Sequence, residues 1–128
     1  MSVMLDAALS QEEDLLRTVE DLVRFETPTA DKEACDRLAD RLQELFAGDG
    51  WRVLRHAREE AGDILEARLP GGDGPSTLVL THYDTVWPLG TLEAMPFRRE
   101  GDLVYGPGII DMKTGIAMAL HAARLLKR

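Results

Sequence analysis

The sequence has little cysteine, a shortage of basic residues and no long apolar segment, and each shortage argues against a class of protein. The one cysteine, Cys35, cannot form an internal disulfide, and its place in an apolar helical pattern favours a buried thiol over a nucleophile. No run of about 20 apolar residues that could cross a membrane is present. The formal charge of -8, from 15 basic and 23 acidic residues, argues against a nucleic-acid partner, because phosphate recognition needs clustered Lys and Arg.

The composition is that of a globular domain. A chain of 128 residues is long enough for one domain with a real core, and its 45% apolar and 30% charged residues exclude a disordered class. The first ten residues contain Asp6, no basic residue and only a short apolar run, which is unlike a signal peptide. We therefore expect a cytoplasmic protein without a membrane partner.

Periodicity predicts a mixture of helices and strands. Apolar residues recur at helical spacing over residues 11–26, from Asp31 onwards, and from near Lys113 to the end of the chain. Residues 51–58 and 63–69 are typical of a hairpin of half-exposed strands, and residues 97–105 of a second, smaller hairpin. Residues 77–81 (Thr-Leu-Val-Leu-Thr) predict a strand covered on both faces. This order of elements predicts an α/β fold with three-layer packing.

The first candidate site residue, His82, follows the predicted buried strand, at the end where open α/β sheets commonly place ligand-binding groups. Asp84 is close enough to accept a hydrogen bond from one ring nitrogen, which would leave the other free for a metal. The alternative is a histidine at a strand end and an aspartate in a turn before Pro88. These residues alone do not decide between the two.

The second candidate, Asp111, follows the glycine-rich segment Tyr105-Gly106-Pro107-Gly108 and precedes the last helix. In one interpretation the glycines form a turn and Asp111 caps that helix. In the other, the glycines permit a close approach of the backbone and Asp111 reaches a metal. Both are physically sensible for this segment by itself.

Taken together, His82-Tyr83-Asp84-Thr85-Val86 and Gly106-Pro107-Gly108 with Asp111-Met112-Lys113 resemble the M20 family of metallopeptidases. The Gly-Pro-Gly form, preceded by Phe97 and Glu100-Gly101-Asp102, is most similar to its carboxypeptidase G2 or glutamate carboxypeptidase branch. The sequence departs from the family pattern at Thr81, where relatives often have glycine, and at Lys113-Thr114-Gly115, where Lys-Gly-Gly is more usual. Neither departure removes a ligand.

The resemblance implies a site with two zinc ions. His82 would bind one zinc, Asp111 would bridge both, and Asp84 would be the catalytic-site residue that orients His82. It also implies a cis peptide bond between Asp111 and Met112. Two zincs that share a carboxylate can activate a bridging water and polarise a scissile carbonyl, so the implied reaction is amide hydrolysis of a small peptide or acyl amino acid.

Such a site needs more ligands than this sequence supplies. No acidic residue follows Asp111, and His121 has the spacing and neighbours of an ordinary helix position, so we do not assign it as a ligand. We therefore expect residues 1–128 to be the N-terminal portion of an incomplete three-layer α/β/α zinc-peptidase catalytic domain with a mixed sheet, lacking the lid and dimerisation domain. We expect the chain alone to be inactive, and its exposed apolar surfaces to favour self-association.

Three functions stay open at this point. The intact enzyme would be a carboxypeptidase that releases a C-terminal amino acid, for which glutamate is the candidate, or an N-acyl amino-acid deacylase of the same family. The third is a noncatalytic α/β interaction module in which His82, Asp84 and Asp111 only hold loops together.

Overall fold

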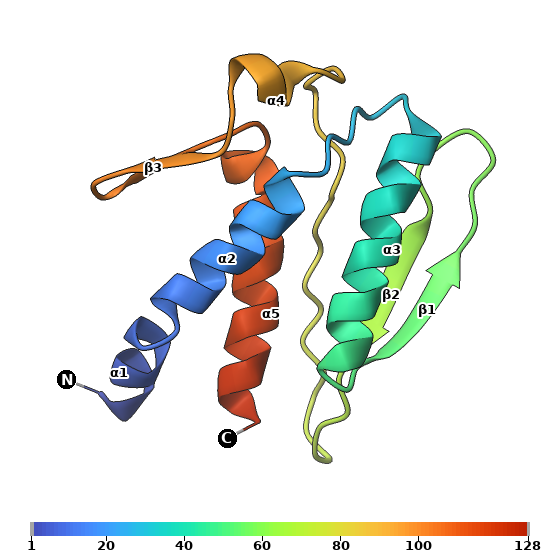
Figure 1. Ribbon diagram of the computed structural model, residues 1–128. Coiled ribbons are helices and arrows are strands. Elements are labelled where there is room, and N and C mark those ends of the chain that lie inside the picture. Colours follow the sequence, from blue (N-terminus) through green and yellow to red (C-terminus); the bar gives the residue numbers. More distant parts are fainter. Residues whose placement is uncertain (1, 128) are drawn as a thin grey trace.

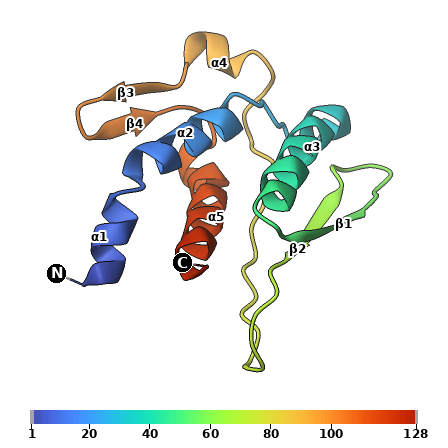
Figure 2. The same ribbon diagram turned by 60° about the horizontal axis from the view of Figure 1, so that its bottom comes forward.

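The computed structural model describes residues 2–127 and contains helices and short strands in alternation. Figures 1 and 2 show the larger hairpin against the helix over residues 32–48. The elements, in chain order, are α1 Val3–Leu9, α2 Glu12–Val23, α3 Lys32–Gly48, β1 Arg52–His56, β2 Ile64–Arg68, α4 Thr91–Ala94, β3 Arg98–Glu100, β4 Leu103–Tyr105, the π-helical turn η1 Ile109–Lys113 and α5 Thr114–Leu126. The predicted α/β class is confirmed.

The core lies where α2, α3 and α5 meet. Each of these helices turns one apolar stripe inward, as the helical spacing of the sequence predicts. Half-buried aromatic rings, among them Phe25 and Phe46, close its edges. The fully enclosed part of the core consists of Val19, Leu22, Val23, Leu38, Leu42, Ile116 and Ala117.

The three predicted helices begin close to the expected residues. Asp31 precedes α3 in an extended conformation, and its Oδ1 accepts a hydrogen bond from the backbone N–H of Ala34 at 2.9 Å. The sequence did not predict α1, because its apolar residues do not face a core: Val3 is 86% and Leu9 55% exposed. Because α1 buries no residue, its sequence has no apolar stripe from which a helix could be predicted.

Both predicted hairpins are present. β1 and β2 pair antiparallel with Val53 opposite Ala67, and β3 and β4 pair antiparallel with Arg99 opposite Val104. Together they form two separate two-stranded sheets. The β1–β2 hairpin packs against α3.

The strand predicted at residues 77–81 is wrong. This segment runs as an extended trace between α3 and α5, without a strand partner in the described part of the chain (Figures 1 and 2). Leu78 is 79% and Leu80 80% exposed. An apolar run becomes a buried strand only when other strands cover its edges, and residues 2–127 supply none beside it.

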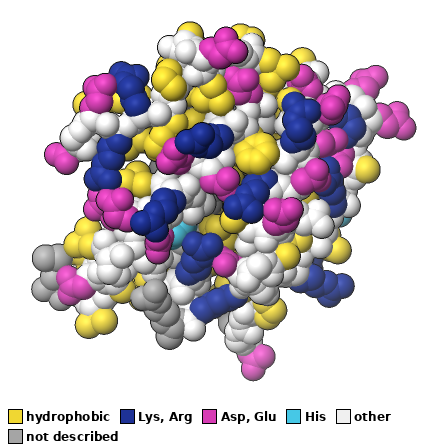
Figure 3. All heavy atoms as spheres, in the orientation of Figure 1, with side chains coloured by type: hydrophobic (Ala, Val, Ile, Leu, Met, Phe, Trp, Pro, Cys, Tyr) yellow, Lys and Arg dark blue, Asp and Glu magenta, His cyan; other side chains and the backbone are white. Residues whose placement is uncertain are grey.

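Charges of both signs are mixed on the surface. On the face drawn in Figure 3, Lys and Arg side chains lie next to Asp and Glu side chains. Ion pairs among the described residues include Arg24 with Glu20 at 2.6 Å and Arg41 with Asp21 at 2.7 Å. Within residues 2–127, every helix is too short or too polar to cross a membrane.

Candidate functional site

The structure brings His82, Asp84 and Asp111 together. The Nδ1 atom of His82 lies 3.1 Å from Oδ1 of Asp84 and 3.1 Å from the backbone carbonyl oxygen of the same residue. The other ring nitrogen, Nε2, lies 2.8 Å from Oδ1 of Asp111. Since both oxygens near Nδ1 can only accept, Nδ1 carries a hydrogen, and the ring is oriented with Nε2 toward Asp111.

The electrostatics of His82 follow from these contacts. Partial burial by itself lowers the pKa of the ring, because a charged imidazolium loses water. The carboxylates of Asp111 and Asp84 outweigh that effect and raise the pKa above its usual value. The side chain of Asp111 is 82% exposed and that of His82 46% exposed, so the pair faces solvent.

The backbone around Asp111 departs from helical geometry. Gly108 has φ 74°, and a Cβ at this position would lie 2.6 Å from Cγ2 of Thr85, so only glycine fits there. Asp111 itself has φ -124° and ψ 91°, and the Asp111–Met112 peptide bond is cis, as the family resemblance implied. The close approach expected of the glycine-rich turn is confirmed at Gly108.

The alternative role of Asp111 as a helix cap is wrong. Gly108 precedes η1 and Lys113 precedes α5, and neither helix start has a side-chain capping hydrogen bond. The carboxylate of Asp111 instead approaches His82, and the Sδ atom of Met112 accepts a hydrogen bond from the backbone N–H of His82 at 3.4 Å. The glycine-rich turn and the His82 segment are therefore in direct contact.

A threonine-rich segment after α2 holds the His82 segment from the other side. The backbone N–H of Thr85 donates to the carbonyl of Thr27 at 2.7 Å, and the N–H of Thr29 donates to the carbonyl of Thr85 at 3.0 Å. The hydroxyl of Thr27 donates to the carbonyl of Tyr83 at 2.7 Å, and that of Thr29 to Oδ2 of Asp84 at 2.6 Å. The sequence analysis assigned no role to Thr27 and Thr29 and so missed these contacts.

Lys113 connects the Asp111 segment to the residues that follow α2. Its side chain is only 1% exposed, and Nζ donates to the backbone carbonyl of Phe25 just after α2. Burial lowers the pKa of this amine to about 8. The end of α2 thus contacts both segments that carry the candidate site residues.

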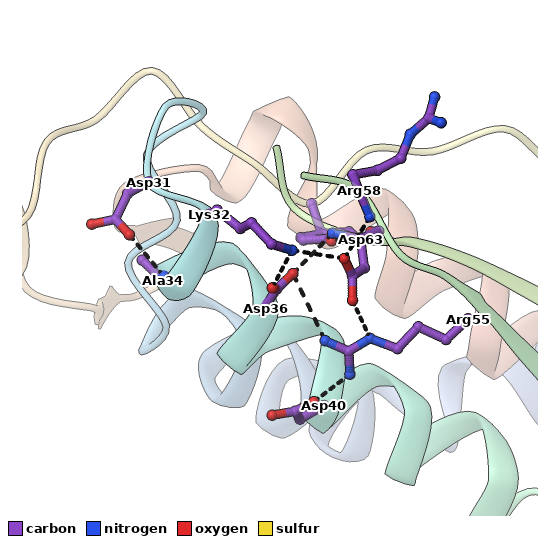
Figure 4. Close-up of polar contacts among 9 residues, drawn as sticks. Asp31, Lys32, Ala34, Asp36, Asp40, Arg55, Arg58 and Asp63 are labelled. Carbon is purple, nitrogen blue, oxygen red and sulfur yellow. Dashed lines mark hydrogen bonds and ion pairs between the residues drawn. The ribbon is translucent and has the colours of Figure 1, made fainter. Parts of the chain in front are cut away.

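A charged cluster lies between α3 and the β1–β2 hairpin (Figure 4). The carboxylate of Asp63 accepts from Nζ of Lys32 at 2.8 Å, from Nε of Arg55 at 2.6 Å and from the backbone N–H of Arg58 at 3.0 Å. Asp36 also pairs with Lys32, at 2.6 Å. These contacts join the start of α3 to the β1–β2 hairpin, and the sequence analysis did not identify them.

His121 lies apart from the candidate site. It is 5% exposed on α5, with Nε2 2.9 Å from the hydroxyl of Thr18 and 3.0 Å from Nη1 of Arg124. Its Nδ1 atom lies 3.3 Å from Oε1 of Gln11. Both ring nitrogens of His121 thus have protein partners.

The residues present fit part of a zinc site. An imidazole nitrogen and a carboxylate oxygen face each other at a solvent-exposed point, and the imidazole is held through its other nitrogen, which is the usual arrangement of a histidine ligand. Across residues 2–127, however, no group of three or more His, Cys, Asp and Glu side chains is placed to hold a metal ion. The pair His82 and Asp111 is a partial ligand set.

Comparisons with known proteins agree with these motifs. Residues 78–128, which include all three site residues, match the model of peptidase family M20/M25/M40. Over 128 aligned residues, 98% of this chain, it is 38% identical to carboxypeptidase G2 of Pseudomonas sp. (strain RS-16), and it covers 31% of that protein.

Other relatives have different names. The chain is 38% identical to a succinyl-diaminopimelate desuccinylase of Leptothrix cholodnii over 84% of its own length and 29% of that protein. It is 33% identical to a cysteinylglycine-S-conjugate dipeptidase of Corynebacterium striatum over 75% of its length and 21% of that protein. The chain therefore spans less than a third of the length of these curated relatives.

Proposed function

The chain belongs to peptidase family M20/M25/M40, and on that premise we propose that residues 1–128 supply part of the active site of a two-zinc amide hydrolase. In this proposal Nε2 of His82 would hold one zinc ion, and the carboxylate of Asp111 would be a ligand shared by both. Asp84 is the catalytic-site residue that fixes the orientation of His82. Residues outside this chain supply the general base and the remaining ligands, so the chain alone is inactive.

One observation carries the proposal. Nε2 of His82 and Oδ1 of Asp111 are 2.8 Å apart although the residues are 29 positions apart in the chain, and the opposite ring nitrogen is held by Asp84. When bound, zinc ions polarise a carbonyl and lower the pKa of a bound water. What this chain contributes is an imidazole of fixed orientation and an exposed carboxylate beside it.

The substrate class follows from the names of the relatives. The carboxypeptidase and the dipeptidase are named for cleaving peptides and the desuccinylase for removing a succinyl group, which supports hydrolysis of an amide bond as the reaction. We propose a small peptide or acyl amino acid as the substrate, with release of a C-terminal amino acid, for which glutamate is the candidate. The desuccinylases among the relatives support an N-acyl amino-acid deacylase as the second candidate.

The remaining sequence-based expectations stay predictions. They are a cytoplasmic location and self-association of this chain. Exposed apolar side chains at Leu78, Leu80 and Ile110, the last 94% exposed, support the expectation of self-association.

The test uses the full-length gene product and counts bound zinc by mass spectrometry after dialysis. His82→Ala and Asp111→Asn are expected to lower the zinc content and abolish hydrolysis of N-acyl glutamate and a glutamate-terminated dipeptide. His56→Ala is the matched control, because His56 is an exposed histidine whose partner is Glu66 on the β1–β2 hairpin. If His82→Ala retained as much zinc as His56→Ala, the noncatalytic alternative would be favoured instead.

A further inference from the structure

The carboxylate of Asp84 has two oxygens with different partners. Oδ1 lies against the ring of His82 at 3.1 Å, and Oδ2 accepts the hydroxyl hydrogen of Thr29 at 2.6 Å. We propose that Thr29 is a positioning residue of the metal site, whose hydroxyl holds Asp84 so that Asp84 in turn holds His82. This inference rests on the proposed function, because it extends the chain of contacts that ends at the metal ligands.

Backbone hydrogen bonds hold Thr29 in place, although its hydroxyl also lies 3.2 Å from the Thr85 carbonyl oxygen. The segment that contains Thr29 forms a short parallel bridge with the His82 segment, at Pro28 and Thr85. Two hydrogen bonds make it: Thr85 N–H to the Thr27 carbonyl at 2.7 Å and Thr29 N–H to the Thr85 carbonyl at 3.0 Å. Replacing the Thr29 side chain therefore leaves the backbone contacts in place.

The Thr29 hydroxyl restrains the orientation of the Asp84 carboxylate. A carboxylate can rotate about its last side-chain bond, and the side chain of Asp84 is 35% exposed, so water competes for both oxygens. A hydroxyl donated to a carboxylate is a charge-assisted hydrogen bond, stronger than one between neutral groups. In residues 2–127 the carboxylate has Thr29 and His82 as its protein partners, one for each oxygen. Without the Thr29 hydroxyl the Asp84 carboxylate can rotate, and its contact with the His82 ring is then no longer fixed.

The contacts form a line that crosses the site. The hydroxyl of Thr29 meets Oδ2 of Asp84, Oδ1 of Asp84 meets Nδ1 of His82, and Nε2 of His82 meets Asp111. Residues that orient a histidine ligand commonly change metal affinity by about 10- to 100-fold when they are removed. Thr29 acts one step further out, so we expect an effect at the lower end of that range.

The experiment compares Thr29→Val, which keeps the shape and removes the hydroxyl, with Thr29→Ser, which keeps the hydroxyl. Zinc affinity of the full-length gene product is measured by competition with a chromophoric chelator. Thr29→Val is expected to weaken zinc binding by about tenfold, and Thr29→Ser to restore affinity to near that of the unaltered protein. Thr91→Val is the matched control, because the Thr91 hydroxyl donates to the Pro88 carbonyl at 2.7 Å and does not touch Asp84.

Thr29→Val is also made in an Asp84→Ala protein, to distinguish a positioning role of Thr29 from a purely structural one. If Thr29 acts through Asp84, Thr29→Val changes zinc affinity less than twofold once Asp84 is absent. A loss there as large as in the unaltered protein would overturn the proposal, and so would a Thr29→Val protein that binds zinc normally.

A metal-free readout distinguishes this proposal from the proposed function. The ¹⁵N shifts of His82 report which ring nitrogen carries hydrogen when the ring is neutral, and Thr29→Val should shift the population away from the Nδ1–H form. If the unaltered protein binds zinc no better than His82→Ala, the proposed function fails. A change in the His82 ¹⁵N shifts on Thr29→Val would still support the positioning role of Thr29. Unchanged shifts would overturn it.

Discussion

The phenolic hydroxyl of Tyr83 donates a hydrogen bond to the backbone carbonyl of Asp63. Tyr83 stands between the two site residues His82 and Asp84, and Asp63 is the centre of the charged cluster that joins α3 to the β1–β2 hairpin. The contact thus links the candidate site to this charged cluster. Because Tyr83 is half-buried, loss of water raises the pKa of its phenol to about 12, and the hydroxyl stays a donor throughout the neutral range.

Tyr83→Phe tests this link. The substitution keeps the ring and leaves the Asp63 carbonyl without its phenol partner, so we expect a loss of ~1 kcal/mol in the free energy of unfolding, measured with urea. Tyr105→Phe is the control, since the Tyr105 ring under Arg98, 3.9 Å from Cζ to the ring centre, is kept. Equal effects of the two substitutions would contradict a specific role for the Tyr83 hydroxyl.

Asp63→Asn is expected to change how stability depends on pH. The Lys32 ammonium, the Arg58 backbone N–H and the Arg55 guanidinium hold the pKa of the Asp63 carboxyl well below its usual range. A carboxyl with a lowered pKa in the folded state stabilises the fold above its unfolded pKa, near 4, and loses that contribution as the pH falls through the folded pKa.

The melting temperature of Asp63→Asn should therefore lie below that of the unaltered protein at neutral pH, and the two should converge in acid. Asp73→Asn, in the exposed turn over residues 70–75, is the control and should leave the melting temperature unchanged throughout. A gap between Asp63→Asn and the unaltered protein that stayed constant down to the acid limit would show that the ion pairs contribute nothing.

The fold was predictable from the sequence where structure is local. The two hairpins and the helices that contribute to the core follow from periodicity and turn residues, which neighbouring residues determine. The segment 77–81 was mispredicted because its apolar residues indicate a buried strand only if other strands lie beside it. Likewise, the sequence did not predict α1, because its apolar side chains face solvent rather than the core.

The site was predictable only in part, for a related reason. The pair His82 and Asp111 came from the conjunction of two motifs, and the structure places them 2.8 Å apart. Thr29 and Asp63 were missed, since Thr29 bonds to Asp84, 55 positions away, and Asp63 bonds to Tyr83, 20 positions away. Contacts of that range leave no periodic signal, and a threonine after a helix break has the same sequence pattern whether or not it touches a site.

Gly62→Ala is expected to destabilise the protein. A Cβ at Gly62 would lie 2.6 Å from the Cβ of Cys35 and 3.0 Å from the hydroxyl oxygen of Tyr83, so α3 or the hairpin must shift. Overpacking of this kind costs ~1–3 kcal/mol of unfolding free energy. Gly71→Ala is the matched control, because nothing lies within 4 Å of a Cβ there. Cys35→Ala should not rescue Gly62→Ala, since the clashing atom is the Cβ that alanine keeps; full rescue would contradict the geometry.

His121 should make the fold less stable in mild acid. Burial lowers the pKa of its imidazole, and the neighbouring Arg124 guanidinium lowers it further. Since Arg124 can only donate, Nε2 of His121 is the acceptor and Nδ1 carries the hydrogen toward Gln11. Protonation would add the ring's second hydrogen at Nε2, where it would face the guanidinium.

The sign of the effect follows from linkage. The unfolded chain protonates His121 near pH 6.5, while the folded protein does so only at lower pH, so the unfolded state binds more protons in between. The contribution of His121 is present above the unfolded pKa and is lost as the pH falls toward the folded pKa, with a slope of at most ~1.4 kcal/mol per pH unit. His82 contributes the opposite slope, because its pKa is raised.

The measurement that isolates His121 is therefore a difference between two proteins. Urea unfolding of the unaltered protein and of His121→Gln is compared from about pH 7.5 to about pH 5, a range that spans the unfolded pKa of histidine. The contribution of His82 is the same in both proteins and cancels in the difference. We expect the stability of the unaltered protein to fall relative to His121→Gln as the pH decreases. Parallel curves would mean that His121 titrates alike in the folded and unfolded states, and its buried contacts with Thr18 and Arg124 would then have no effect on its charge.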